Sequence, residues 1–281
     1  MPSSILEEPV FSPVVILPTY NNGRTVIGVL DRAAALELPL IVVNDGCTDE
    51  TAEALAAWKL RRRPPTADVT ILTHSANRGK AAALHTGFAA AEAAGHTHAV
   101  TIDTDGQLDP EQIPELLEAA RLQPRALVLG MRDATSADYP ARSRLGRTLS
   151  NGAIRLECGR RIADSQCGLR VYPLELLRAV EQGGCHAPYF AFEAEIITKA
   201  GWAGFPIAQV PVNCRYLPPG EQVSHFRPFR DSLRGLALHL KLLARSVFPR
   251  QRLPHPADAH PTPAPAPATA QGGLSREAFP R

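Results

Sequence analysis

Residues 99–107 read AVTIDTDGQ, a short apolar run that leads into two aspartates. The run AVTID is typical of a buried strand, and Asp103, Asp105 and Gln107 follow one another at intervals of two residues. Residues two apart on a strand share a face, and a turn at the strand end can bring these three side chains to one point. Oxygen ligands of this kind suit Mg²⁺ or Mn²⁺, which often keep open positions for substrate phosphates. The segment therefore predicts a strand that ends in a divalent metal site.

The motif is open to two other interpretations. Two aspartates so spaced also occur in ordinary strand-to-helix turns, so the spacing alone indicates a metal only weakly. An EF-hand loop that began at Asp103 would need glycine at its sixth position and an acid at its twelfth. The sequence has Leu108 and Pro114 there, which excludes that loop.

Strand-like and helix-like segments alternate around the motif. Strands are predicted at 14–18, 40–45, 69–73, 99–103 and 126–131, and helices at 24–36, 49–61, 80–94 and 110–120. This order implies an α/β fold with a parallel sheet that helices cover on both faces. Such sheets bind ligands at the carboxyl ends of their strands. Four polar segments should therefore meet at one rim, namely PTYNNG (18–23), NDGCTDE (44–50), SANRGK (75–80) and DTDGQ (103–107).

The second half of the chain is less regular. Helices are predicted at 142–158, 192–200 and 229–248, and extended segments at 164–172 and 207–216. In the last helix a stripe of apolar residues recurs at helical spacing, made up of Leu233, Leu236, Leu240, Leu243 and Val247. This stripe can lie in a membrane interface or pack on the sheet. We predict packing, because one short basic helix binds a membrane only weakly.

The domain organisation follows from these patterns. We expect an N-terminal extension at 1–12, one domain at 13–248 and a disordered Pro/Ala-rich tail at 249–281. Within the domain, the nucleotide half spans about 13–132 and the acceptor half about 133–248.

Composition excludes several classes of protein. The 30 Lys and Arg residues nearly balance the 28 Asp and Glu residues, so the net charge of +2 gives no case for a nucleic-acid partner. No apolar run approaches the roughly 18 residues of a membrane span, and the N-terminus lacks the order of a signal peptide. The five cysteines are an odd number without a C-x-x-C pair, which fits a reducing compartment. We therefore expect a cytoplasmic protein, with peripheral contact at the inner face of the membrane as an option.

The other rim segments suit a nucleotide. Asp45 ends the second strand, where an acid can accept hydrogen bonds from a ribose or a base. An Asp-Gly turn is the alternative interpretation, and the two are compatible. Tyr20 can stack on a base or pack half-buried. Arg78 and Lys80 flank a glycine ahead of a helix, which suits an anion. The glycine fingerprint of NAD-dependent oxidoreductases is absent after the first strand.

Together these motifs resemble the family-2 glycosyltransferases with the GT-A fold, over about 14–216. The matching segments are LPTYNNGRTV, IVVNDGCTDET, NRGKAAALHTG, IDTDGQLDPEQIPEL, and LSNGAIRLECGRRIADSQCGLRVYP through to VPVNCRY. The similarity is greatest to the dolichyl- or polyprenyl-phosphate branch, which shares D-x-D-x-Q with a following proline and a later D-x-x-x-G. The resemblance implies a mostly parallel nucleotide-binding sheet with a mixed acceptor-side half. It also implies inverting transfer from a nucleoside-diphosphate sugar to a lipid-phosphate or hydroxyl acceptor.

The resemblance assigns roles to individual residues. The nucleotide-sugar site would comprise Pro18, Tyr20, Asn22, Asp45, Arg78, Lys80, Asp103 and Thr104. The metal, Mg²⁺ or Mn²⁺, would be held by Asp103, Asp105 and Gln107. The acceptor would be bound by Arg144, Arg147 and Gln166, and the catalytic carboxylates would come from Asp164, Glu193 and Glu195.

The sequence is compatible with either a hydroxyl or a phosphate as the acceptor. Asp164 matches either a base or an organiser of the acceptor site, and DSQCG at 164–168 replaces the D-P-x-x-G of some lipid-phosphate members. Glu193 and Glu195 lie about 200° apart on a helix, so one of them should face the site. A hydroxyl acceptor needs a carboxylate base, whereas a phosphate is already an anion that arginines can position. Arg144 and Arg147 could instead form a solvated helix face.

Two further classes compete with this assignment. A non-catalytic nucleotide-sugar binder would share the fold, but the intact aspartate motif argues against it. A sugar-1-phosphate nucleotidyltransferase would carry a Gly-rich phosphate loop after the first strand, where this chain has PTYNNG.

Overall fold

The computed structural model describes residues 10–61, 68–135, 141–182, 187, 191–216 and 228–247. The predicted tail at 249–281 and most of the predicted extension at 1–12 lie outside these residues. None of the described helices is both long enough and apolar enough to span a bilayer.

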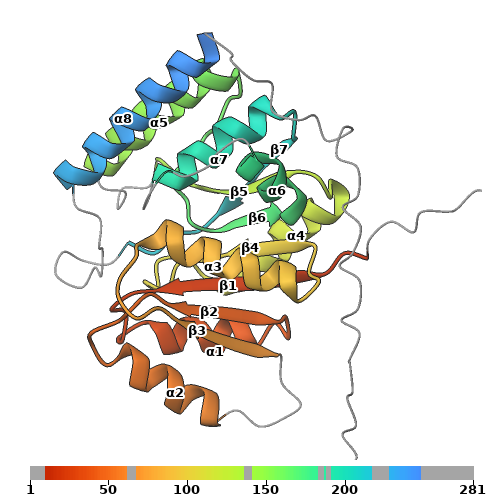
Figure 1. Cartoon of the computed structure of the whole chain (residues 1–281), viewed down its shortest axis with the longest axis vertical. Coiled ribbons are helices and arrows are strands. Elements are labelled where there is room, and N and C mark those ends of the chain that lie inside the picture. The colour runs from red at the N-terminus through yellow and green to blue at the C-terminus, as the bar shows by residue number, and fades with distance from the viewer. Residues whose placement is uncertain are drawn as a thin grey trace, which may run out of the picture.

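Within the described residues, seven strands form one sheet in the order β3-β2-β1-β4-β6-β5-β7 (Figure 1). They are β1 (Pro13–Thr19), β2 (Leu40–Asn44), β3 (Val69–Thr73), β4 (His98–Thr101), β5 (Leu127–Arg132), β6 (Arg170–Pro173) and β7 (Ile207–Val212). Among these strands, β6 alone is antiparallel to its neighbours β4 and β5, and the other pairs are parallel. The predicted α/β class with a mostly parallel sheet and a mixed second half is therefore confirmed.

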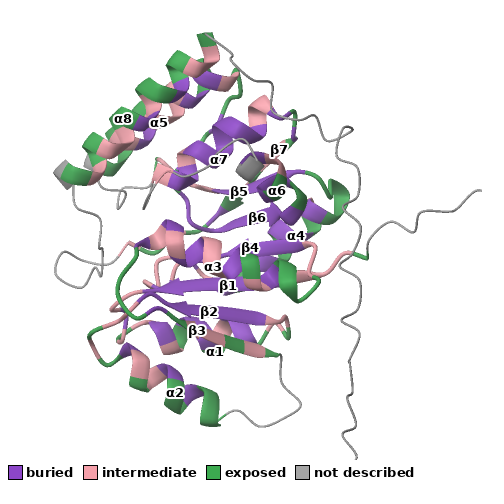
Figure 2. Cartoon of the chain, in the orientation of Figure 1, coloured by how far each residue is buried: buried purple, intermediate pink, exposed green. Residues whose placement is uncertain are grey.

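Helices cover both faces of the sheet. They are α1 (Val26–Ala34), α2 (Thr51–Arg61), α3 (Lys80–Ala93), α4 (Ile113–Leu122), α5 (Ala141–Cys158), α6 (Leu174–Gln182), α7 (Ala191–Trp202) and α8 (Pro228–Val247), and a short 3₁₀ turn, η1 (Pro110–Gln112), precedes α4. Alternate residues of β1 point to opposite faces, so Val14 and Ile16 pack with α3, α6 and α7, while Val15 and Leu17 pack with α1, α2 and α4. The buried sheet between exposed helix surfaces is visible in Figure 2. Helix α6 was not predicted, because its nine residues follow β6 without a break.

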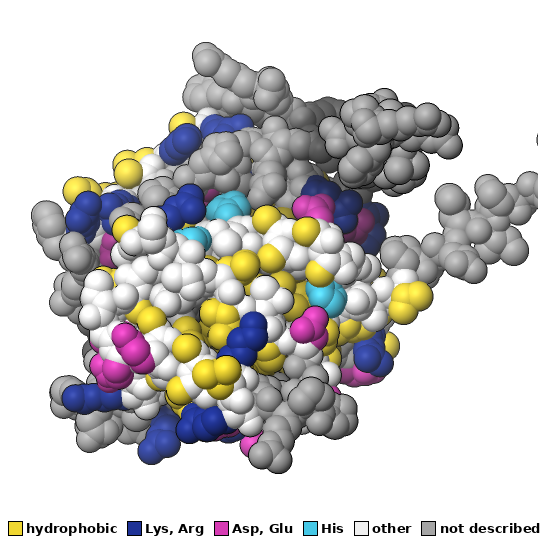
Figure 3. Space-filling model, turned by 60° about the horizontal axis from the view of Figure 1, so that its bottom comes forward, with side chains coloured by type: hydrophobic (Ala, Val, Ile, Leu, Met, Phe, Trp, Pro, Cys, Tyr) yellow, Lys and Arg dark blue, Asp and Glu magenta, His cyan; other side chains and the backbone are white. Residues whose placement is uncertain are grey.

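Helix α8 departs from its prediction. Leu238 and Leu242 are its buried leucines, and the helix packs on α5 and α7 rather than on the sheet. The stripe of Leu233, Leu236, Leu240, Leu243 and Val247 is exposed instead, so the prediction that it packs on the sheet is wrong. Hydrophobic and basic side chains stand together along the upper left margin of Figure 3, the side on which Figure 1 places α5 and α8. The helix is apolar on two sides, and periodicity alone does not say which side meets the core.

Gly46 fixes how the turn after β2 meets the loop before α3. Its φ is +66°, a conformation that strains residues with a side chain, and a Cβ there would lie 2.6 Å from the backbone nitrogen of Asn77. The turn and the loop are thus in direct backbone contact, and glycine is the residue that permits it.

We predict that Gly46→Ala lowers the free energy of unfolding more than Gly95→Ala does. Gly95 has a similar φ of +78° but open space around its Cβ position, so its substitution should cost only about 1–2 kcal/mol of left-handed strain. Gly46→Ala should add a steric cost of about 1–3 kcal/mol to that strain. Urea denaturation of both variants measures the difference, and equal losses would show that the contact at Asn77 is unimportant.

Candidate functional site

The loops that follow β1 and β4 are joined by side chains. Asn22 donates from Nδ2 to Thr104 Oγ1 at 2.7 Å, and that hydroxyl donates to the Pro18 carbonyl at 3.1 Å. Asn22 and Thr104, both predicted to bind the nucleotide, are 7% and 1% exposed. Within the described part of the chain, the buried Oδ1 of Asn22 has no hydrogen-bond partner, so a ligand donor could be accepted there. Tyr20 is half-buried at the same rim.

Asp45 holds the loop that precedes α3. Its carboxylate accepts from the backbone nitrogens of Arg78 at 2.9 Å and Gly79 at 2.7 Å, and it lies 2.7 Å from His74 Nδ1. The His74 ring also contacts the Thr86 hydroxyl at 2.9 Å. Asp45 therefore organises the rim between β2 and α3, the Arg78 side chain remains exposed, and their contact with a nucleoside stays a prediction.

Lys80 lies between two carboxylates from distant parts of the chain. Its Nζ is 2.7 Å from Asp103 Oδ1 and 3.0 Å from Glu193 Oε1, which α7 supplies. Burial opposes the charge, but the two carboxylates outweigh it and raise the pKa of Lys80 above its ordinary value. A cation in the first turn of a helix opposes the helix dipole, and these two anions compensate for it. The structure thus brings together Lys80, Asp103 and Glu193.

Asp105 completes the aspartate motif in an environment that disfavours its charge. Burial, and next the neighbouring carboxylate of Asp103, raise the pKa of Asp105 to about 6. Its Oδ1 accepts from the Gln107 backbone nitrogen at 2.9 Å. A Cβ at Gly168 would lie 2.7 Å from Asp103 Cγ, so the glycine of the D-x-x-x-G segment leaves room for this carboxylate.

The charges and donor atoms fit a divalent cation. Two close carboxylates that repel each other are relieved by a cation, and Gln107, two residues further along, carries an amide oxygen that is a further candidate ligand. The described residues contain no group of three or more His, Cys, Asp or Glu side chains that could hold a metal. Phosphate oxygens of a bound ligand could add to the oxygens of Asp103 and Asp105 around such a cation.

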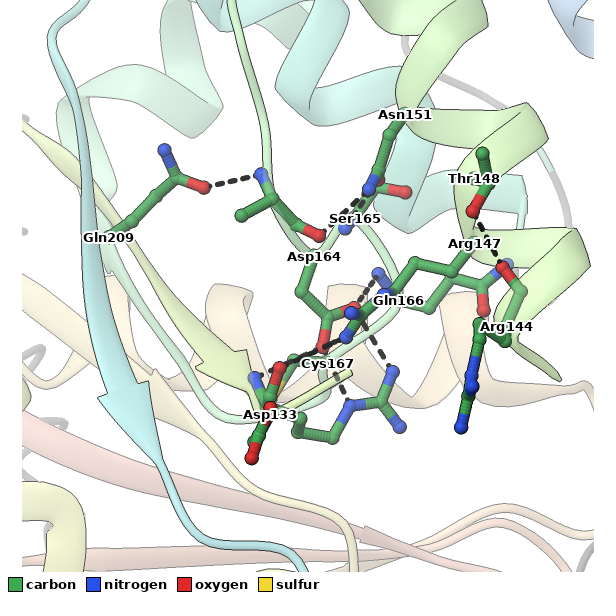
Figure 4. Close-up of polar contacts among 12 residues, drawn as sticks. Asp133, Arg144, Arg147, Thr148, Asn151, Asp164, Ser165, Gln166, Cys167 and Gln209 are labelled. Carbon is green, nitrogen blue, oxygen red and sulfur yellow. Dashed lines mark hydrogen bonds and ion pairs between the residues drawn. The ribbon is translucent and has the colours of Figure 1, made fainter. Parts of the chain in front are cut away.

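Asp164 is enclosed by donors at the end of β5 (Figure 4). Arg132 binds its two oxygens with Nε at 2.7 Å and Nη2 at 3.0 Å, and Arg147 Nη1 from α5 adds a contact at 3.2 Å. Backbone nitrogens of Arg132 and Gln166 also donate to it. Burial favours the neutral acid, but the arginines outweigh burial and lower the pKa of Asp164. A fully enclosed carboxylate of low pKa is a poor base, so the geometry favours Asp164 as an organiser of the acceptor site over Asp164 as a base.

The other predicted acceptor-side residues separate into two groups. Arg147 is 6% exposed and also donates to the Arg132 carbonyl, so it is not part of a solvated helix face. Arg144 and the Gln166 side chain are exposed. A Cβ at Gly146 would lie 3.7 Å from Gln166 Nε2, which places this amide beside the first turns of α5.

Glu193 and Glu195 face different surroundings, as their spacing predicted. Glu195 lies 2.6 Å from Lys199 Nζ and accepts from the Ala187 backbone nitrogen at 2.7 Å. Glu193 is the one that reaches Lys80 beside Asp103.

Sequence reasoning missed two arginines, one partly buried and one fully buried. Arg132 is the last residue of β5, and its position at a strand end was the available signal. Arg170 is fully buried and donates to the carbonyls of Cys167, Ser165 and Glu193. It ties the 164–168 loop to the start of α7, and nothing in the pattern around it distinguished it from a surface residue.

A polar chain leads from this loop to α8. Ser165 Oγ donates to Ser150 Oγ at 3.1 Å, Ser150 Oγ is 3.2 Å from His239 Nε2, and His239 Nδ1 is 2.7 Å from Glu157 Oε1. Thr198 of α7 donates to the other Glu157 oxygen at 2.7 Å. The acceptor-side loop, α5, α7 and α8 are therefore held together by one network.

Comparison with known proteins finds glycosyltransferases both by sequence and by fold. The model of glycosyl transferase family 2 matches residues 14–180. Undecaprenyl-phosphate mannosyltransferase of Micrococcus luteus is 27% identical over 71% of this chain and 82% of its own length. Glycosyltransferase AglD of Haloferax volcanii is 32% identical over 71% of this chain, which spans only 32% of that relative. Glucosyl-3-phosphoglycerate synthase of Mycobacterium tuberculosis, solved with Mn²⁺, UDP-glucose and phosphoglyceric acid, shares the fold with a TM-score of 0.62, 20% identity, and coverage of 84% of this chain and 80% of that one.

We predict that Asp105→Asn stabilises the metal-free protein at neutral pH. An acid whose pKa rises from 3.8 to about 6 on folding binds more protons in the folded state between these values, so its contribution to stability falls as pH rises through that window. At pH 7.5 the variant should gain about 1–3 kcal/mol in the free energy of unfolding. The gain should shrink towards pH 4. Urea titrations in EDTA measure it, with exposed Asp68→Asn as the control; equal curves for wild type and Asp105→Asn would refute the prediction.

Proposed function

The chain belongs to glycosyl transferase family 2 and is a glycosyltransferase, and we propose that it moves a sugar, with inversion, from a nucleoside diphosphate to the phosphate of a membrane lipid. The observation that carries this proposal is the cluster of Asp103, Asp105 and Lys80 at the carboxyl edge of a parallel sheet. Ligands bind at that edge in sheets of this kind.

The donor is proposed from the charges of this cluster. Asp103, Asp105 and Gln107 would hold Mg²⁺ or Mn²⁺, and a bound metal would neutralise charge on the donor diphosphate. Lys80 supplies a further positive charge from the protein itself. The Mycobacterium tuberculosis enzyme with Mn²⁺ and UDP-glucose supports a nucleoside-diphosphate sugar as the donor class. Asn22, Asp45, Arg78 and the segment from Pro18 to Tyr20, with Thr104, would surround the nucleotide.

The acceptor is proposed to be a lipid phosphate rather than a hydroxyl. A hydroxyl would need a carboxylate base, and the three predicted bases are engaged: Asp164 by arginines, Glu193 by Lys80 and Glu195 by Lys199. A phosphate acceptor is already ionised and needs no base. The Micrococcus luteus relative, whose name describes transfer to undecaprenyl phosphate, supports this choice.

The mechanism is one in-line displacement. An oxygen of the acceptor phosphate attacks the anomeric carbon, the new C–O bond forms, and the bond to the donor diphosphate breaks on the opposite face of the sugar. Asp164 keeps Arg132 and Arg147 in place, and exposed Arg144 and Gln166 would orient the acceptor phosphate. Holding both substrates in this geometry lowers the entropic part of the barrier, and Lys80 stabilises the charge that grows on the leaving diphosphate. With a lipid acceptor, the protein would work at the inner face of the membrane.

We predict that one nucleoside diphosphate raises the unfolding midpoint in a Mn²⁺-dependent way. Wild type would be heated with UDP, GDP, CDP, dTDP or NAD, each with and without Mn²⁺. A ligand at about 100 times its Kd adds about 2.7 kcal/mol to stability, a shift of several degrees. Asp105→Asn should lose this shift because it loses a metal ligand, whereas Asp68→Asn should keep it. A shift with NAD alone, or with no diphosphate, would contradict the donor assignment.

We predict that labelled sugar then passes to undecaprenyl phosphate and becomes extractable into organic solvent. Asp103→Asn should reduce this transfer at least about a hundredfold, since it weakens the binding of the metal that would neutralise the leaving diphosphate. Transfer only to a hydroxyl acceptor would overturn the acceptor assignment. Release of pyrophosphate would point to a nucleotidyltransferase, and binding of the donor without any transfer would point to a non-catalytic binder.

A further inference from the structure

Exposed apolar side chains are concentrated on two neighbouring helices. Of the eleven exposed large hydrophobic residues in the described part of the chain, eight belong to α5 and α8. We call these eight residues the α5–α8 face: Leu145, Leu149, Leu156, Leu233, Leu236, Leu240, Leu243 and Val247. Such a concentration marks an interaction surface, whereas single exposed leucines are ordinary.

The face belongs to a firmly attached layer. Helix α8 buries Leu238 and Leu242 against its neighbours, and His239 contacts the buried Glu157 of α5 at 2.7 Å. The exposed residues recur at intervals of three, four or seven on both helices, so each helix presents one apolar side outward. The face is therefore a fixed surface and not the result of a poorly packed helix.

The exposed charges that the structure describes on these two helices have one sign. Every exposed charged side chain that the structure describes on α5 and α8 is basic: Arg144, Arg155, Arg230 and Lys241. The acids of these helices turn inward, since the side chain of Asp231 is 7% exposed beside Arg234 and that of Glu157 is 1% exposed. The whole chain carries only +2, so this positive charge is local.

We propose that the α5–α8 face docks on the surface of an anionic lipid bilayer. Leucines that enter the interface while basic side chains meet anionic headgroups are the two contributions that hold amphipathic helices on membranes. A second copy of this chain is a poorer occupant, because a symmetric contact would set two basic faces against each other.

The orientation that results suits the proposed function, on which this part of the inference rests. Arg147, which reaches the Asp164 carboxylate at 3.2 Å, lies on α5 between Leu145 and Leu149. A helix is only about 10 Å wide, so docking of its outer side brings the acceptor side close to the lipid headgroups. A lipid phosphate would then reach the site without leaving the membrane.

Vesicle flotation of the full chain tests the proposal. The protein would be mixed with vesicles of phosphatidylcholine alone, or of phosphatidylcholine and phosphatidylglycerol in equal parts, at low and high salt. Wild type should float with the anionic vesicles and be released by salt. The double variant Leu236→Ser/Leu240→Ser should bind at least about tenfold more weakly, since burial of one leucine is worth about that factor. The matched control Leu60→Ser/Leu122→Ser alters exposed leucines elsewhere and should bind as wild type does.

Three results would overturn the proposal. These are failure of wild type to bind anionic vesicles, equal loss of binding in both double variants, or a wild-type dimer in sedimentation that Leu236→Ser/Leu240→Ser dissociates. The nucleotide-dependent shift of the unfolding midpoint is measured on the same proteins. Since it does not depend on lipid, a failed docking surface is distinguished from a failed donor assignment and from a misfolded variant.

Discussion

Charge compensation at the carboxyl edge of the sheet is the constraint on which the site depends. Lys80 forms ion pairs with Asp103 and Glu193, and Arg132 and Arg147 form ion pairs with Asp164. A buried charge that loses its partner costs several kcal/mol. Replacement of any one of these groups by an uncharged residue would therefore destabilise the protein through the charge that it leaves unpaired. The loops at 74–80, 103–107 and 164–168 are consequently positioned by ion pairs and hydrogen bonds, while the apolar clusters on the two faces of the sheet hold the strands that carry them.

The nucleotide half of the fold was predictable because its signals are local. The segment 69–73 forms β3 with the predicted limits, and Asp103 and Asp105 follow β4 at the rim to which three other polar segments converge. Parallel strands with continuous apolar runs admit few arrangements, so a polar residue after such a strand is placed with little ambiguity. Spacing could not predict the hydrogen bond between Asn22 and Thr104, or the hydrogen bond by which Asp45 holds the loop before α3. Both interactions depend on the direction in which a side chain points.

The acceptor half was less predictable because its contacts are distant in sequence. Arg132 and Asp164 meet across 32 residues, and the local pattern around each is unremarkable. The stripe on α8 was assigned to the wrong side, since Leu238 and Leu242 satisfy the same helical spacing as the residues that remain exposed. A buried glutamate, Glu157, depends on His239 from a helix about eighty residues later. Pairings of this kind are set by packing between elements and leave no periodic trace in either element.

The place of β6 has consequences for how the chain emerges from the ribosome. This strand lies between β4 and β5 but is synthesised after both. When synthesis has reached residue 132, β1 to β4 can already pair, yet one edge of β4 is open and β5 has no neighbouring strand. The open edge of β4 and one edge of β5 become paired only when residues 170–173 form β6. The other edge of β5 becomes paired when residues 207–212 form β7. An unpaired edge is a template for pairing with other chains. A nascent chain that stalls between residues 132 and 170 is therefore the form most exposed to aggregation, and its rescue depends on a strand of four residues.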